Sequence, residues 1–82
     1  MSGAIPLRDY VVGGLVSEHT VNDLLPFGEP MLTDYRGVPG HGEAPPYRAW
    51  LRRRGGGRTM GPPDLTPQLA AEALLRKVWG ER

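Results

Sequence analysis

The chain contains no cysteine, which excludes disulfide bonds and removes the thiolate ligands of most structural zinc sites. Its 82 residues can form one small domain with a modest core, and no disulfide bond stabilises that core. Long apolar runs are also missing, and residues 1–20 carry several charges. We therefore expect no signal peptide, no contact with a membrane, and a cytoplasmic or virion-associated protein.

Groups suited to catalysis are scarce. The only two histidines, His19 and His41, are far apart in the sequence, and His41 has too few ligand-type neighbours for a metal site. Neither serine has the flanking glycines typical of a nucleophile. The glycines at 55–57 lack the Lys-Ser/Thr pair of a phosphate-binding loop. We expect no enzyme, and no cofactor, metal or small-molecule substrate.

Glycine and proline are abundant instead: 12 Gly and 9 Pro make up about a quarter of the chain, a composition typical of extended, low-complexity segments. The apolar residues nevertheless cluster in short patterned runs. This combination predicts a small α+β fold with much irregular structure, in an extended chain that becomes ordered partly on a partner. Arginine outnumbers lysine nine to one, a bias of GC-rich codons that indicates a high-GC bacterium or one of its phages.

Residues 1–27 are predicted to form an arm, a β-hairpin and a short helical turn. Tyr10–Val12 and Leu15–Val16 favour strands, and Gly13-Gly14 suits the tight turn between them. One longer strand with a glycine kink is the alternative. The helical turn begins near Thr20 and is ended by Pro26.

Residues 28–45 are predicted to be a long extended Pro/Gly-rich segment with one short strand at 31–35. An arginine-rich short helix follows within 46–58, near 46–54. Pro46 suits its first position, Tyr47, Trp50 and Leu51 fall on one helical face, and Gly55 suits its end. Residues 59–65 are predicted to be a linker.

The segment 66–82 contains the clearest helix signal. Thr66 is a suitable cap, Pro67 suits the first helical position, and Gly80 ends the pattern, which predicts a helix near 66–79. Ala71, Leu74, Leu75, Val78 and Trp79 form its apolar stripe. This stripe packs either on the chain's own core or in the groove of a partner.

The charges are divided along the chain. Residues 1–43 carry two arginines against six acids, whereas residues 44–82 carry eight bases against three acids. The two halves either fold against each other or face different neighbours. Five arginines lie within residues 48–58, and three interpretations of this run remain: a protein interface, contact with nucleic acid, or a solvated surface.

The function that we expect is that of a non-enzymatic structural or accessory subunit of a larger multi-protein assembly. Its most specific form is a minor virion protein of a phage of a high-GC bacterium. The alternative is a small nucleic-acid-binding regulator that uses the Arg48–Arg58 patch. The expected interface residues are Tyr47, Arg48, Trp50, Arg52, Arg53, Arg54, Arg58, Leu74, Val78 and Trp79.

Overall fold

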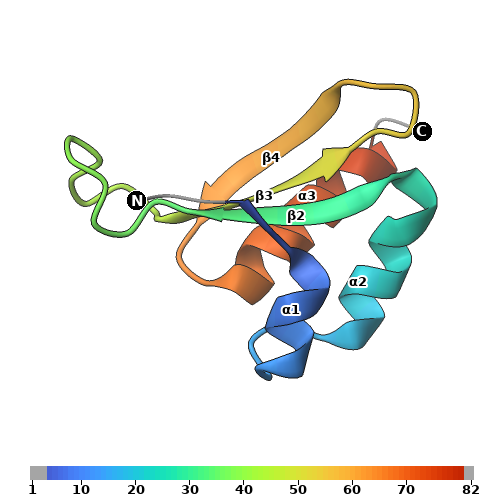
Figure 1. Ribbon diagram of the computed structural model, residues 1–82, viewed down its shortest axis with the longest axis horizontal. Helices are drawn as coiled ribbons and strands as arrows, with labels where there is room; N and C mark the ends of the chain where they lie inside the picture. The colour runs from blue at the N-terminus through green and yellow to red at the C-terminus, as the bar shows by residue number, and fades with distance from the viewer. Residues whose placement is uncertain (1–3, 81–82) are drawn as a thin grey trace.

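Four strands form one antiparallel sheet in the order β1–β2–β3–β4 in the computed structural model, which describes residues 4–80 (Figure 1). The strands are β1 (Ala4–Pro6), β2 (Glu29–Asp34), β3 (Tyr47–Arg52) and β4 (Arg58–Asp64). Helices α1 (Leu7–Val12) and α2 (Glu18–Leu24) and the 3-10 turn η1 (Leu25–Phe27) connect β1 to β2. Helix α3 (Pro67–Gly80) follows β4. Residues 1–3, part of the predicted arm, and residues 81–82 lie outside the described residues.

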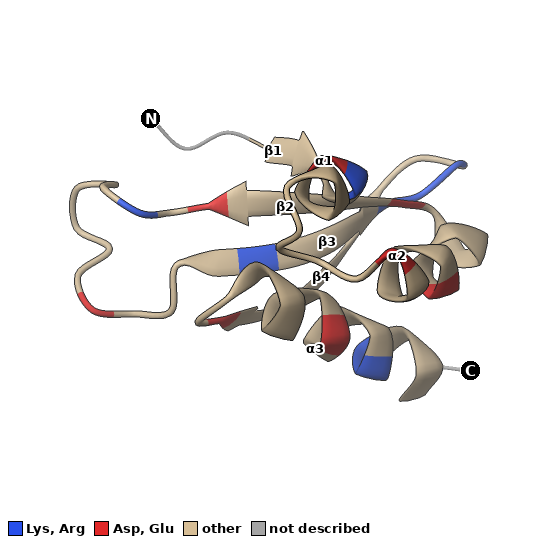
Figure 2. Ribbon diagram, turned by 90° about the horizontal axis from the view of Figure 1, so that it is seen from below, with Lys and Arg blue, Asp and Glu red and all other residues tan. Residues whose placement is uncertain are grey.

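All three helices of the described residues lie on one face of the sheet (Figures 1 and 2). The core forms between the two layers, where Leu32, Ala49 and Leu51 of the sheet meet Ala71 and Leu74 of α3, all fully buried. The radius of gyration is 12.0 Å, which matches the value of about 12 Å for a compact domain of this length. The expected α+β class is therefore confirmed, but the described residues form a compact unit rather than an extended chain.

Glycine is required where α3 crosses β4. A Cβ atom added at Gly61 would lie 2.9 Å from the Ala49 carbonyl oxygen and 3.0 Å from the Leu74 Cβ. Because real Cβ atoms essentially never approach backbone this closely, only glycine lets the helix pack against the strand here. The last strand and the last helix are thus held in direct contact.

The predicted hairpin at residues 10–16 is wrong, because this segment belongs to α1 and the turn after it. Leu7, Tyr10 and Val11 recur at helical spacing, with Leu7 fully buried and the other two packed against the core. Of the two glycines predicted to form the turn, Gly14 has a positive φ, +77°, whereas Gly13 ends the helix in a right-handed conformation. The run of β-favouring residues was therefore overridden by the burial of one helical face.

The predicted helix at 46–54 is also wrong, because residues 47–52 form the central strand β3. Strand β3 pairs with β2 on one side and with β4 on the other, so Trp50 and Leu51 lie on opposite faces of the sheet. Residues 59–65, predicted to be a linker, are mostly strand β4. Pro62 and Pro63 are tolerated there because β4 is an edge strand.

The predicted Pro/Gly-rich segment 28–45 is divided. Its first part is β2, close to the short strand expected at 31–35, and residues 35–46 form the loop that leads to β3.

The predicted C-terminal helix is confirmed as α3. The Thr66 side chain accepts a hydrogen bond from the Leu69 amide at 3.1 Å, as expected of a cap. The stripe of α3 packs on the chain's own sheet, with Leu74 and Val78 buried, whereas Trp79 is 54% exposed.

Candidate interaction surface

Strand β3 places arginines on the face of the sheet that lies opposite the helices. Ala49 and Leu51 point into the core, so the alternating positions Arg48, Trp50 and Arg52 point to the other face. The guanidinium of Arg58, on β4, lies 4.9 Å from the centre of the Trp50 ring. Arg48, Arg52 and Arg58 therefore share with Trp50 a face of the sheet that no helix of the described residues covers.

Trp50 is a structural anchor of this face rather than an exposed ring. Only 4% of the residue is accessible, and its indole Nε1–H donates a hydrogen bond of 2.9 Å to the Thr33 hydroxyl. The Arg58 guanidinium lies over the ring in cation–π geometry. Trp50 therefore orients Arg58, and it offers no free surface on which a base could stack.

Arg53 has a different role, because it fastens the β3–β4 hairpin to the turn η1. Its Nε–H donates to the Thr59 hydroxyl at 2.7 Å, and its terminal nitrogen donates to the Phe27 carbonyl at 3.1 Å. These bonds hold the turn end of the hairpin against η1, just before the start of β2. The neighbouring Arg52 and Arg54 are exposed.

No arginine of the hairpin forms an ion pair with a carboxylate of the described residues, although Glu29 lies opposite Arg52 in the β2–β3 register. Arg52 and Arg58 lie directly opposite each other in the strand register, an arrangement in which like charges repel. The ion pairs among the described residues join Glu29 to Arg8, Asp23 to His19 and Asp34 to Arg36, and none includes an arginine of the hairpin.

Of the two interpretations of the divided charges, the first holds within residues 4–80: the two halves fold against each other, because β2 pairs with β3 along its whole length, although no ion pair joins the acidic half to the arginine run. We call Arg52, Arg54 and Arg58 the arginine surface.

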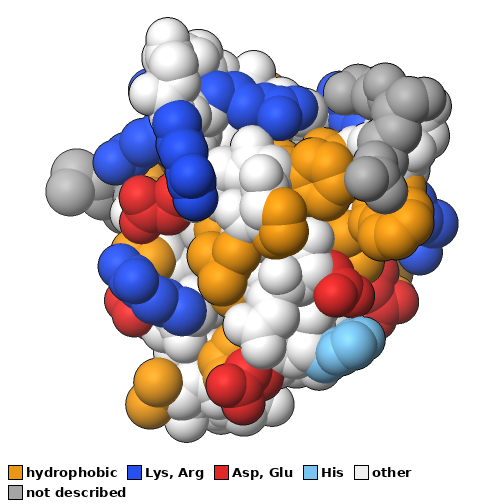
Figure 3. Space-filling model, turned by 90° about the vertical axis from the view of Figure 1, so that its right-hand side faces the viewer, with side chains coloured by type: hydrophobic (Ala, Val, Ile, Leu, Met, Phe, Trp, Pro, Cys, Tyr) orange, Lys and Arg blue, Asp and Glu red, His pale blue; other side chains and the backbone are white. Residues whose placement is uncertain are grey.

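The arginine surface borders a shallow hollow with a volume of about 480 Å³. Leu25 of η1, Gly28 and Glu29 form one side of the hollow, and the end of β3 with residues 53–54 forms the other. Figure 3 shows positive side chains gathered along the upper part of this side of the molecule. A partner that binds the arginines would therefore also contact the start of β2.

The other predicted interface residues are placed elsewhere. Leu74 and Val78 are 0% and 2% exposed in the core, so their predicted role in an interface is wrong. Tyr47 is half-buried against the core, and the Arg36 guanidinium lies 5.3 Å from its ring centre. Trp79 is exposed at the end of α3, apart from the residues that line the hollow.

The sequence analysis missed Leu25 and Glu29. The pair Leu24-Leu25 before Pro26 was a usable signal, because adjacent apolar residues at the end of a helix cannot both face the same core. The structure buries Leu24 completely and leaves Leu25 46% exposed.

A second polar cluster lies at the opposite end of β2 and satisfies its charges internally. Arg36 donates hydrogen bonds to both carboxylate oxygens of Asp34, which lowers the pKa of Asp34. Burial, together with the nearby Asp34 charge, raises the pKa of Tyr10. His41 stacks on Tyr35 with ring centres 5.2 Å apart, and its Nε2 lies 3.1 Å from the Pro45 carbonyl. These contacts hold the 35–46 loop.

Neither a metal site nor a membrane span is found among residues 4–80. No three side chains of the ligand types His, Asp and Glu gather closely enough there to hold a metal ion. None of the helices described has the length and apolar character that a membrane span requires.

The comparison of the chain with family models, curated proteins and solved structures finds no match.

Proposed function

We propose that this chain is a non-enzymatic accessory subunit of a larger multi-protein assembly, which it joins through the arginine surface. The observation that carries the proposal is the lack of carboxylate partners for Arg52, Arg54 and Arg58 within the described residues. An acidic surface of a neighbouring subunit would supply the missing charge. Arginine is also one of the residue types that contribute most to protein interfaces.

Two further features favour a protein as the partner. The burial of Trp50 removes the stacking platform that single-stranded nucleic acids use. The exposed Leu25 beside the arginines adds apolar contact area of the kind found in protein interfaces. Composition and small size favour a minor virion protein of a phage of a high-GC bacterium as the specific form of this proposal.

A nucleic-acid-binding regulator is the second candidate. It is favoured by the cross-strand pair Arg52 and Arg58, together with Arg48 on the same face of the sheet. Phosphates would relieve the repulsion between these charges, and guanidinium groups bind phosphates well. The net charge of +1 gives only weak attraction of the whole protein to a nucleic acid.

A site-specific photo-crosslinker separates these candidates. It is placed at Arg54 and, as a control, at Leu65, an exposed residue between β4 and α3 that does not line the hollow. After irradiation in cells of the source organism, the assembly proposal expects a covalent adduct at position 54 that withstands nuclease but not protease. A nuclease-sensitive adduct would support the regulator instead. Equal adducts at both positions, or none at position 54, would contradict both candidates.

A further inference from the structure

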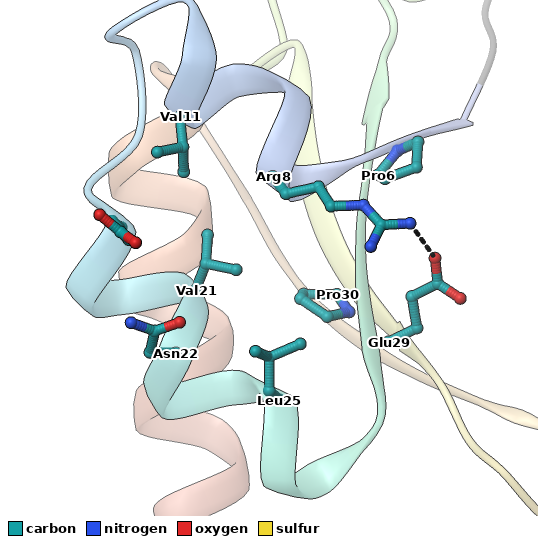
Figure 4. A pocket seen from close by; sticks show the side chains of 9 residues that line it. Pro6, Arg8, Val11, Val21, Asn22, Leu25, Glu29 and Pro30 are labelled. Carbon is teal, nitrogen blue, oxygen red and sulfur yellow. Dashed lines mark ion pairs between the residues drawn. The ribbon is translucent and has the colours of Figure 1, made fainter.

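A second hollow lies between α1, α2 and the start of β2. Its apolar wall is formed by Val11, Val21, Leu25 and Pro30, together with Pro6 (Figure 4). Arg8, Glu18, Asn22 and Glu29 complete the lining. Its volume of about 260 Å³ is below the range of about 300–1,000 Å³ typical of small-molecule pockets, and is suited to a single bulky side chain.

This hollow and the one beside the arginines adjoin each other, because Leu25 and Glu29 line both. We call the two together the groove, which has an apolar half and a basic half. Figure 3 shows hydrophobic side chains exposed below the positive side chains on this side of the molecule. A ligand that fills the groove therefore needs both an apolar group and negative charge.

The charges of the basic half specify the sign of the ligand there, whereas the apolar half carries Glu18 as well as Arg8 and Glu29. Glu29 has Arg8 as its partner, with 3.8 Å between the guanidinium nitrogen and the carboxylate oxygen. The basic half keeps Arg52 and Arg54, which have no carboxylate partner among the described residues. Charge complementarity thus requires carboxylates at the basic half of the groove.

We propose that the groove binds an acidic segment of a partner protein, which inserts one bulky apolar side chain between α1 and α2 and places carboxylates against Arg52 and Arg54. This proposal rests on the proposed function and specifies the chemistry of the partner. It also gives Leu25 a role, since this exposed leucine lies where the two halves of the groove meet.

Fluorescein-labelled synthetic peptides test the proposal by fluorescence anisotropy. Each peptide carries one tryptophan and a short run of glutamates, and the spacer between them is varied across the panel. Control peptides replace the tryptophan by serine or the glutamates by lysines, and a single-stranded oligonucleotide of similar length tests for nucleic acid. We expect at least one peptide of the panel to bind, and each control peptide with the same spacer to bind about tenfold or more weakly.

Protein variants locate the binding. Leu25→Ser should weaken binding of the acidic peptide about tenfold. Leu15→Ser, at an exposed leucine outside the groove, should leave the affinity unchanged. Arg52→Gln with Arg54→Gln should weaken it by at least the same factor, and Arg76→Gln on α3 serves as the control. Glu29→Gln should strengthen binding about twofold to threefold, because it removes the carboxylate that opposes an acidic ligand.

Three results would overturn the proposal. The first is that no peptide of the panel binds. The second is that binding is unchanged both by replacing the tryptophan of the peptide and by Leu25→Ser. The third is a dimer, detected by sedimentation, that Leu25→Ser dissociates, since the occupant would then be a second copy. The first two results leave the crosslink expected at Arg54 unchanged, so the proposed function fails separately, whereas a dimer would appear there as a crosslink between two copies of the chain. Tighter binding of the oligonucleotide than of every peptide would assign the basic half to nucleic acid.

Discussion

The two faces of strand β3 differ in what they contribute to the protein. One face carries Ala49 and Leu51, both fully buried beneath α3, whereas the other carries Arg48, Trp50 and Arg52. The first face packs entirely against other residues of the same chain. The second ends in charges without carboxylate partners among the described residues. The difference indicates that the inner face of β3 maintains the fold, and it agrees with the proposal that the arginine surface meets a partner.

The largest effect on stability is expected in the core of the helical side. Leu74→Ala leaves a cavity between α3 and the sheet and should lower the free energy of unfolding by about 2–5 kcal/mol. Leu69→Ala, at a 40% exposed position of the same helix, should cost less than about 1 kcal/mol. Urea denaturation followed by circular dichroism measures both. Equal losses would mean that the sheet and α3 do not form the core.

An intermediate effect is expected at Trp50, the buried residue of the arginine side. Trp50→Phe removes the hydrogen bond to Thr33 and should cost about 1–2 kcal/mol, and Arg58→Gln should cost about 0.5–1 kcal/mol. The double variant should lose less than the sum of the two, because both single changes disrupt the same cation–π contact. Strict additivity in a double-mutant cycle would show that Arg58 does not stack on Trp50.

The smallest effect concerns Asp34, and it depends on pH. Hydrogen bonds from Arg36 keep the pKa of folded Asp34 below its ordinary value of 3.8. The pair therefore stabilises the protein above pH 3.8, and this contribution is lost as the pH falls through the lower folded pKa. Asp34→Asn should flatten the fall in melting temperature below about pH 4, and Arg36→Gln should do the same. If the melting temperature of both variants fell below about pH 4 as steeply as that of the original protein, the Asp34–Arg36 pair would have no part in acid unfolding.

The sequence predicted α3 because its signals are local and mutually consistent. Thr66, Pro67 and an apolar stripe that ends at Gly80 all specify the same helix. For 47–52, local signals were ambiguous: Tyr47, Trp50 and Leu51 fit one helical face, but Arg48, Trp50 and Arg52 also alternate with buried residues. Pairing with β2 and β4 decided between them, and such long-range contacts are not visible in a local pattern.

The candidate site was predictable only in part. The clustering of Arg52, Arg54 and Arg58 follows directly from the sequence. The groove does not, because it brings α1, η1 and the start of β2 next to a hairpin more than twenty residues further along the chain. The burial of Trp50 was likewise hidden, since it depends on Thr33 and Arg58 from the two neighbouring strands.

The most direct test of this division between the two sides is the double variant Arg52→Gln and Arg54→Gln, measured for stability and for crosslinking from position 58. We expect its free energy of unfolding to remain within about 0.5 kcal/mol of the original protein, while the nuclease-resistant crosslink is lost. A loss of more than about 1 kcal/mol with the crosslink unchanged would mean that these arginines serve the fold and not a partner.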